Sequence, residues 1–185
     1  MLSDGQLYEL AKKMGVPLES VSFKDELPAQ LKYNRGYIIN MQNELDDKGL
    51  PNEGSHWCAF QIQKGADGVP LPIYFDPFGV GAPQAVSAAV EAFCGKKLPH
   101  CTKDVQSLLA SCCGYFCMAF LYFINCIPMR TGHVYTDTTG YLDMFLDLNE
   151  SHEFKHNELI LKTFFRSTDP ATRLPIDLGE NIAKF

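Results

Sequence analysis

The sequence lacks the features that mark several large classes of protein. Its longest apolar run, residues 112–124, is shorter than the about 20 residues that a membrane-spanning helix needs. Lysine and arginine form no cluster and the formal net charge is −6, which argues against nucleic-acid binding. There is no internal repeat, no low-complexity segment and no signal-peptide pattern before the first expected helix. These absences favour a globular protein without a membrane or nucleic-acid partner.

Cysteines with the spacing of a disulfide framework or a zinc site are also absent. The seven cysteines are odd in number and unevenly spaced, which favours free thiols in a reducing compartment. The potential zinc ligands nearest together in the sequence do not form two Cys-x-x-Cys pairs: His100, Cys101, Cys112, Cys113 and Cys117. We therefore expect no bound metal and no other cofactor.

What the chain does contain is enough hydrophobic surface for a substantial core. Hydrophobic residues make up 46% of the 185 residues, and aromatic residues make up 12%. This length suits a single domain spanning residues 1–185. A few expected strands and several expected helices predict an α+β fold, in which a small mixed β-sheet packs on a central buried helix with outer helices around it.

Capping residues and apolar periodicity predict the first elements. Ser3 and Gln6 form a capping-box pattern for a helix that Gly15 and Pro17 end. Residues 17–35 are expected to be irregular. Strands are predicted at residues 37–39, 56–62, 71–75 and 101–105. The second and third of these strands are expected to form a hairpin.

Helices dominate the remainder of the chain. One begins with Pro83 and is ended by Gly95. The stretch from Cys113 is apolar on all sides, which predicts the central buried helix, and Pro128 is expected to end it. Residues 128–185 are expected to form a helical C-terminal part, with helices after Asp137 and from Asn149 or Ser151 through Phe165, and a tail of little periodicity after Asp169.

Cys113 is the leading candidate for a reactive residue. It stands at the expected N-terminus of the central helix, where free N–H groups and the helix dipole stabilise a thiolate. Gly114, which follows it, would let a substrate backbone approach closely. Cys112 is the rival nucleophile, although it lacks a glycine directly after it. The alternative that Cys113 is an ordinary buried cysteine stays open at this point.

A cysteine nucleophile needs a base, a group that orients the base, and donors to the oxyanion. His56 precedes one hairpin strand and Asp76 follows the other, so we expect both at one edge of the sheet. Gln106 offers an amide donor, and the backbone N–H of Cys113 offers another. Trp57 is expected to pack over the His56 ring. The alternatives are a surface histidine, a strand-ending turn aspartate and a solvated glutamine.

The local sequence around these residues is more specific than their spacing. A His-Trp pair at His56 opens one strand, and Asp-Pro-Phe-Gly from Asp76 closes the next. Gln-x6-Cys-Gly-x-Phe from Gln106 precedes the apolar helix. With Ile-Ile-Asn ending at Asn40, this arrangement resembles the adenovirus-type maturation cysteine proteases, the adenain-like family, relatives of which virophages and polinton-like elements encode. The order His, Asp, Cys also looks like the wider clan that includes the SUMO-specific proteases.

The resemblance implies a cysteine endopeptidase with a base, an orienting acid, an oxyanion donor and a nucleophile at His56, Asp76, Gln106 and Cys113. The residues it implies for substrate binding are Trp57, Gly114 and Asn40. It implies that the substrates are viral capsid precursors, cut at glycine-containing sites in the virion and the host-cell cytoplasm. The adenoviral enzymes are activated by DNA and a disulfide-linked peptide, but the acidic charge and the position of Cys101 favour neither here. We expect a monomer.

Two features depart from the family pattern. The acid is Asp76, where the adenoviral enzymes carry glutamate and the SUMO-specific proteases carry aspartate. The residues after about Pro128 show no match to the family. Two other functions fit the same residues: a protease specific for ubiquitin-like proteins, and a catalytically inactive, capsid-associated interaction protein.

Overall fold

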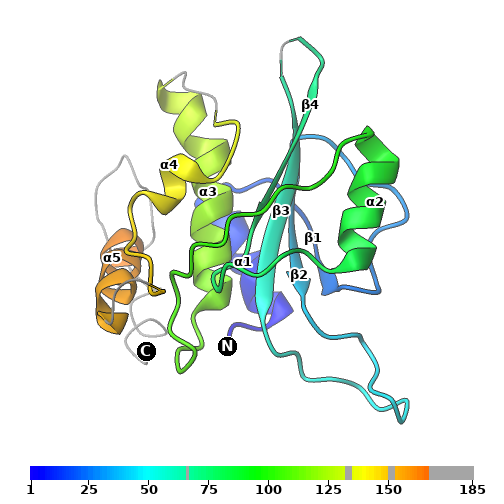
Figure 1. Cartoon of the computed structure of the whole chain (residues 1–185), viewed down its shortest axis with the longest axis horizontal. Coiled ribbons are helices and arrows are strands. Elements are labelled where there is room, and N and C mark those ends of the chain that lie inside the picture. The colour runs from blue at the N-terminus through cyan, green and yellow to red at the C-terminus, as the bar shows by residue number, and fades with distance from the viewer. Residues whose placement is uncertain (66, 132–134, 150–152, 167–185) are drawn as a thin grey trace.

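A computed structural model shows an α+β protein, and it describes residues 1–65, 67–131, 135–149 and 153–166 (Figure 1). One mixed sheet carries four strands in the spatial order β1-β2-β3-β4. Their bounds are β1 Leu18–Phe23, β2 Gly36–Asn40, β3 Trp57–Lys64 and β4 Pro70–Phe75. β1 pairs with β2 in parallel, whereas the pairs β2–β3 and β3–β4 are antiparallel. The α+β class predicted from the sequence is therefore confirmed.

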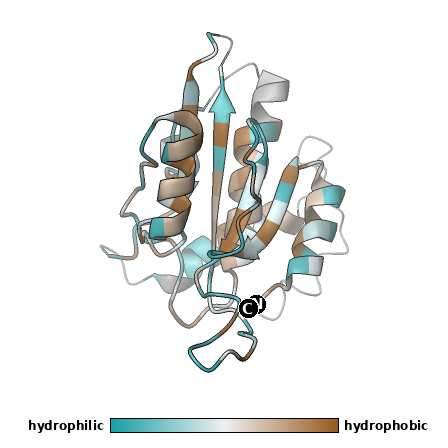
Figure 2. Ribbon diagram, turned by 90° about the vertical axis from the view of Figure 1, so that its right-hand side faces the viewer, coloured by the Kyte–Doolittle hydropathy of each residue, from teal (hydrophilic) through white to brown (hydrophobic). Residues whose placement is uncertain are grey.

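Helices cover both faces of this sheet, as Figures 1 and 2 show from two directions. The described residues contain the helices α1 Asp4–Met14, α2 Gln84–Cys94, α3 Cys113–Thr131, α4 Thr139–Leu142 and α5 Phe154–Arg166. α2 lies on one face, while α3 packs on the other together with α1 and α5. None of the described helices combines the length and the apolar character that crossing a membrane requires.

Strand β3 has buried side chains on both faces, because the sheet lies between two hydrophobic cores. Cys58, Phe60 and Ile62 point into the core shared with α2. Trp57 and Ala59 belong to the larger core around α3. Alternation along a strand sends successive side chains to opposite faces, so one strand can serve both cores. The sheet therefore lies between α2 on one face and α3 on the other.

The first helix follows the prediction closely. Ser3 caps α1, and its hydroxyl accepts a hydrogen bond from the backbone N–H of Gln6. The Gln6 side chain in turn accepts from the backbone N–H of Ser3, which completes the capping box. Gly15 ends the helix with φ of 71°, a left-handed conformation that suits glycine. The hairpin of β3 and β4 and the C-terminal end of α2 at Gly95 are also as predicted.

The secondary structure of two segments was predicted wrongly. Residues 18–23, expected to be irregular, form β1, an edge strand whose residues are all only partly buried, so its apolar signal is weak. Residues 101–105 were expected to form a strand but join no sheet. The backbone carbonyl of Asp104 accepts from the N–H of Leu148, and that of Val105 accepts from the Asn157 amide. Contacts with the C-terminal part of the chain therefore replace strand pairing.

The predicted helix boundaries also need correction. α3 continues past Pro128 to Thr131, because a proline removes one backbone hydrogen bond but can be accommodated within a helix. Pro83 is the N-cap of α2 and not its first residue. Thr138, not Asp137, caps the short helix α4, although Asp137 accepts a hydrogen bond from the N–H of Thr139.

The C-terminal predictions are only partly within the described residues. The predicted inward side chains of Tyr141, Phe145 and Leu148 are buried. α5 begins at Phe154, later than the predicted start at Asn149 or Ser151, and ends at Arg166. Ser151 and the tail after Asp169 lie outside the described residues.

Candidate active site

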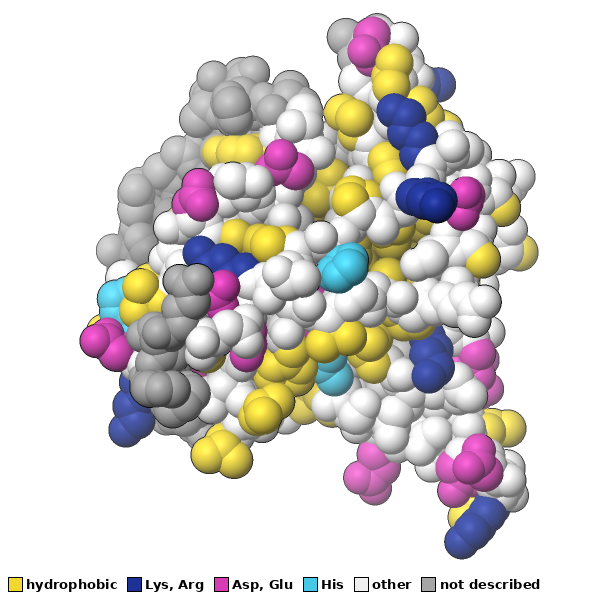
Figure 3. Space-filling view, viewed as in Figure 1, with side chains coloured by type: hydrophobic (Ala, Val, Ile, Leu, Met, Phe, Trp, Pro, Cys, Tyr) yellow, Lys and Arg dark blue, Asp and Glu magenta, His cyan; other side chains and the backbone are white. Residues whose placement is uncertain are grey.

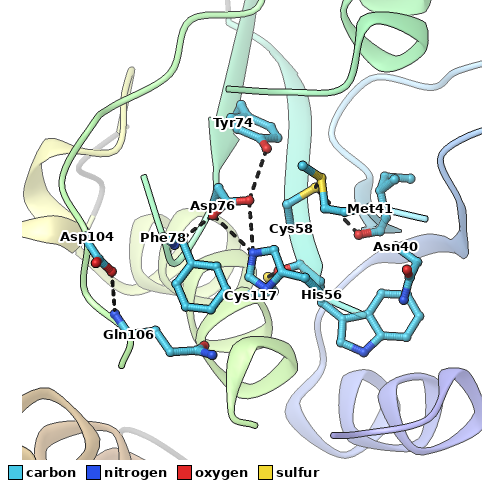
Figure 4. Close-up of polar contacts among 12 residues, drawn as sticks. Asn40, Met41, His56, Cys58, Tyr74, Asp76, Phe78, Asp104, Gln106 and Cys117 are labelled. Carbon is cyan, nitrogen blue, oxygen red and sulfur yellow. Dashed lines mark hydrogen bonds and ion pairs between the residues drawn. The ribbon is translucent and has the colours of Figure 1, made fainter. Parts of the chain in front are cut away.

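The β3–β4 hairpin brings His56 and Asp76 together. His56 immediately precedes β3, and Asp76 immediately follows β4. Ala59 pairs with Phe75 across the two strands, so the start of one strand lies beside the end of the other. The His56 Nε2 atom is 3.1 Å from both carboxylate oxygens of Asp76 (Figure 4). The predicted contact between these two residues is therefore present.

The Asp76 carboxylate is fixed by further donors. The backbone N–H of Phe78 donates to its Oδ1 atom at 2.7 Å, as expected for an Asp-Pro-x-Gly turn. The hydroxyl of Tyr74 lies 3.5 Å from its Oδ2 atom. The Asp76 side chain is fully buried, and the His56 side chain is 11% exposed. A shielded carboxylate with several donors is well suited to hold one orientation of an imidazole ring.

Phe78 is a site residue that the sequence did not reveal as one. Its ring stacks on the His56 ring with centroids 4.3 Å apart and planes 26° apart. We expected Trp57 to cover His56, but its indole N–H instead donates to the backbone carbonyl of Leu2 at 3.0 Å. The sequence signal available for Phe78 was the Asp-Pro-Phe-Gly string, because a turn there brings Phe78 back beside Asp76, the partner of His56. The pattern identified the turn but not the stacking.

Cys113 is the first residue of helix α3 and lies near enough to His56 to affect its pKa. The backbone carbonyl of Cys112 accepts hydrogen bonds from the N–H groups of Tyr115 and Phe116, and these bonds form the first turn of the helix. Burial alone would lower the pKa of His56, but hydrogen bonds to Asp76 and Cys113 and the negative charges of both raise it to about 9. The imidazolium form of His56 is therefore favoured at neutral pH, with Asp76 in direct contact and Cys113 close enough to affect its pKa.

The neighbouring cysteines are in unreactive surroundings. All seven cysteines lie in the described residues and are free thiols. Burial, together with the charge of Glu158, raises the pKa of Cys112. Burial likewise raises the pKa of Cys58 and of Cys117. These thiols stay protonated at neutral pH, so Cys112 is a poor rival to Cys113 as a nucleophile.

Gln106 is buried and tied to the same turn that carries Asp76. Its backbone N–H donates to the carbonyl of Pro77 at 3.1 Å and to the Asp104 carboxylate at 3.2 Å. Its side-chain Nε2 donates to the carbonyl of Ala110 at 2.8 Å, which leaves a second N–H on that nitrogen. Figure 4 shows the Gln106 side chain extending toward the His56 side of the site. These hydrogen bonds hold the Gln106 side chain in one position. Its role as an oxyanion donor stays a prediction.

The residues implied for substrate binding lie in two different settings. Asn40 ends β2 directly opposite Trp57 of β3, and both are buried lining residues of a cavity of 410 Å³. Gly114 is elsewhere, because a Cβ atom built on it would lie 3.3 Å from Leu7 and 3.4 Å from Leu2. The missing side chain of Gly114 therefore allows α3 to pack against the N-terminal segment, a reason different from the one we expected.

Among known proteins, no protein-family model matches the chain and no curated protein matches its sequence. The functional argument therefore begins from the geometry of the site.

Proposed function

We propose that this protein is a cysteine endopeptidase whose nucleophile is Cys113. The observation that supports it most strongly is the position of His56, whose Nε2 atom is 3.1 Å from both carboxylate oxygens of Asp76 and whose pKa the neighbouring Cys113 helps to raise. A base between a thiol and an orienting acid is the arrangement that activates a nucleophilic cysteine. The start of α3 adds the favourable end of a helix dipole beside the sulfur.

The proposed reaction is acyl transfer from nitrogen to sulfur and then to water. The Cys113 thiolate attacks the peptide carbonyl carbon, and the Gln106 amide and the Cys113 backbone N–H donate to the resulting oxyanion. His56 gives its proton to the leaving amine as the carbon–nitrogen bond breaks. In the second step, His56 accepts a proton from water, which attacks the thioester and releases the acid and the thiol. Asp76 holds the ring orientation through both steps.

The proposed substrates are viral capsid precursors, cut at glycine-containing sites during virion maturation. This part of the proposal depends on the resemblance of the His-Trp, Asp-Pro-Phe-Gly and Gln-x6-Cys-Gly segments to adenovirus-type maturation proteases. A nucleophilic Cys113 must stay reduced to react, which agrees with the proposed action in the host-cell cytoplasm and the virion.

A direct test compares alkylation rates of all seven cysteines by iodoacetamide at pH 6, read by peptide mass spectrometry. An ordinary thiol is almost fully protonated at that pH, whereas a thiolate paired with imidazolium reacts. We expect Cys113 to react more than about tenfold faster than the exposed Cys101. The advantage should disappear in His56→Ala.

Hydrolysis is tested with candidate capsid precursors and glycine-containing peptides, using the wild type, Cys113→Ala and Cys112→Ala. The wild type and Cys112→Ala should cleave, and Cys113→Ala should not. Cleavage that survives in Cys113→Ala would refute the assignment of the nucleophile. Slow alkylation of Cys113 in the wild type, together with no cleavage, would support a catalytically inactive protein. Labelling of Cys113 by an electrophilic ubiquitin-like probe would instead support a protease specific for ubiquitin-like proteins.

A further inference from the structure

The loop between β2 and β3, residues 41–56, carries His56 at its C-terminal end. Residues 43–51 of this loop are exposed, and Figure 3 shows acidic side chains at its projecting end, at the lower right of the view. Where the loop joins the sheet, Asn40 pairs with Trp57, the residue that directly follows His56. An exposed loop gains little rigidity from packing, so the position of His56 depends on contacts at this junction.

The Asn40 side chain joins the two ends of this loop. It is 1% exposed, and its Oδ1 atom accepts from the backbone N–H of Gln42 at 3.0 Å and from that of Ser55 at 3.3 Å. The backbone N–H of Met41 also donates to the carbonyl of His56 at 2.9 Å. One buried oxygen atom therefore holds the residue directly before His56 against the end of β2.

The nitrogen end of the same amide lies against Gly54. This glycine has φ of 83°, and a Cβ atom on it would lie 2.4 Å from the Asn40 Nδ2 atom. Only a residue without a side chain lets the backbone pass this close. Nδ2 finds no hydrogen-bond partner among the described residues, so it contributes shape while Oδ1 contributes both hydrogen bonds. Asn40 thus contacts the two residues that lead into His56.

We infer that Asn40 is a positioning residue for His56. Its amide holds the backbone of residues 54–55, and this backbone sets the imidazole against Asp76, whose two carboxylate oxygens lie 3.1 Å from Nε2. A catalytic group displaced by about 1 Å can lose about 100-fold in rate. This inference rests on the proposed endopeptidase function, and it gives Asn40 a role inside the protein that differs from the implied contact with substrate.

Two glycines of the loop provide a matched test. Gly49 has φ of 76°, close to that of Gly54, but a Cβ atom on it meets no atom within 4 Å. Alanine is therefore similarly strained at both positions, while Gly54→Ala alone displaces Asn40. For a cleaved peptide, Gly54→Ala should lower kcat about 30-fold with KM within about twofold, and Gly49→Ala should change kcat by less than about twofold. Equal kcat values in the two variants would overturn the inference.

Substitutions of Asn40 itself separate the role of its oxygen from that of its nitrogen. Asn40→Ala removes the acceptor and should lower kcat about as much as Gly54→Ala. Asn40→Asp keeps an oxygen that accepts from both N–H groups, and it should recover most of this loss. The control is Asn52→Ala, which removes a hydrogen bond of 2.9 Å to the Asn43 carbonyl within the same loop and should leave kcat within about twofold. An Asn40→Asp variant as slow as Asn40→Ala would show that these hydrogen bonds do not position His56.

The titration of His56, followed by NMR of labelled histidine, gives a readout that needs no cleavage. The chain has five histidines, so the signal of His56 is the one that is missing in His56→Ala. Hydrogen bonds to Asp76 and Cys113 and the charges of both raise the pKa of His56 to about 9. An imidazole displaced from Asp76 should therefore titrate at lower pH.

The pKa of His56 should fall toward its ordinary value in Gly54→Ala and in Asn40→Ala, and it should stay at the wild-type value in Gly49→Ala. Gly54→Ala keeps the test available if Asn40→Ala fails to fold. An unchanged pKa in the variants at Gly54 and Asn40 would refute the positioning role and leave the endopeptidase intact. Absence of cleavage by the wild type, with these pKa changes present, would refute the proposed function alone.

Discussion

The His56 imidazole is held in place by Asp76 and Phe78. Asp76 accepts from its Nε2 atom, the Phe78 ring covers one face, and Cys113 is near enough to affect its pKa. These contacts outweigh the effect of burial and raise its pKa to about 9. Below that pH the imidazolium form is retained, and above it the proton that the leaving amine needs is lost. The single residue therefore sets the alkaline limit of the proposed reaction.

The first residue-scale prediction follows from this pKa. In the wild type, kcat/KM for a cleaved peptide should fall as the pH rises through about 9. Asp76→Asn should lower the pKa of His56, move this fall to lower pH, and reduce kcat/KM about 100-fold. The measurement is a pH profile, with the exposed loop variant Asp46→Asn as control. An unchanged alkaline limb in Asp76→Asn would show that Asp76 does not set the pKa of His56.

The second residue-scale prediction separates the oxyanion donor from the nucleophile. Gln106→Ala should reduce kcat for peptide hydrolysis about 100-fold, because one oxyanion donor is lost. The alkylation rate of Cys113 by iodoacetamide should stay within about twofold, because that reaction forms no oxyanion. Parallel losses in both rates would indicate that Gln106 only supports the local structure.

At the scale of elements, the turn after β4 connects Asp76 to Gln106, the proposed orienting acid and oxyanion donor. Asp76 accepts from the N–H of Phe78, and the Pro77 carbonyl accepts from the N–H groups of Val105 and Gln106. Gly79 closes this turn with φ of 66°, and a Cβ atom there would lie 2.5 Å from the backbone carbonyl oxygen of Thr102. The turn therefore tolerates no side chain where the two segments meet.

The element-scale prediction compares two glycine substitutions. Gly95→Ala at the end of α2 meets no atom within 4 Å, so only its φ of 71° opposes alanine, at a cost of about 1 kcal/mol. Gly79→Ala has the same strain and a backbone clash, so the free energy of unfolding should fall by about 3 kcal/mol or more. Urea unfolding measures both. Similar losses in the two variants would contradict the close contact with Thr102.

At the scale of the whole molecule, helix α3 joins the site to the core. It is buried against the sheet, with Phe120 fully buried between Phe75 of β4 and Tyr141 of α4. A pair of side-chain amides adds specificity to this packing, since Gln61 of β3 and the partly buried Asn125 of α3 donate to each other at 3.0 and 2.8 Å. The N-terminus of α3, which carries Cys113, is therefore held against the hairpin that carries His56.

The whole-molecule prediction tests this core. Phe120→Ala should lower the free energy of unfolding by about 3–5 kcal/mol, because it removes a fully buried ring and leaves a cavity. Leu109→Ala, at a side chain that is 99% exposed, should change it by less than about 0.5 kcal/mol. Thermal or urea unfolding gives both values. A small loss for Phe120→Ala would mean that α3 is not the centre of the core.

The sequence by itself determined the features that depend on local chemistry. The capping box at Ser3, the β3–β4 hairpin and the start of α3 at Cys113 follow from short patterns whose physical causes lie within a few residues. The meeting of His56 and Asp76 was predictable for the same reason, because a hairpin places the start of one strand beside the end of the next.

Only the tertiary structure decided the features that depend on distant partners. β1 became a strand by pairing with β2, residues 101–105 lost strand pairing to the C-terminal part, and the Phe78 ring covered His56 in place of Trp57. The cavity beside Asn40 is likewise built from segments far apart along the chain. Their geometry is set by packing between elements, and packing free energy belongs to pairs of surfaces that no local pattern specifies.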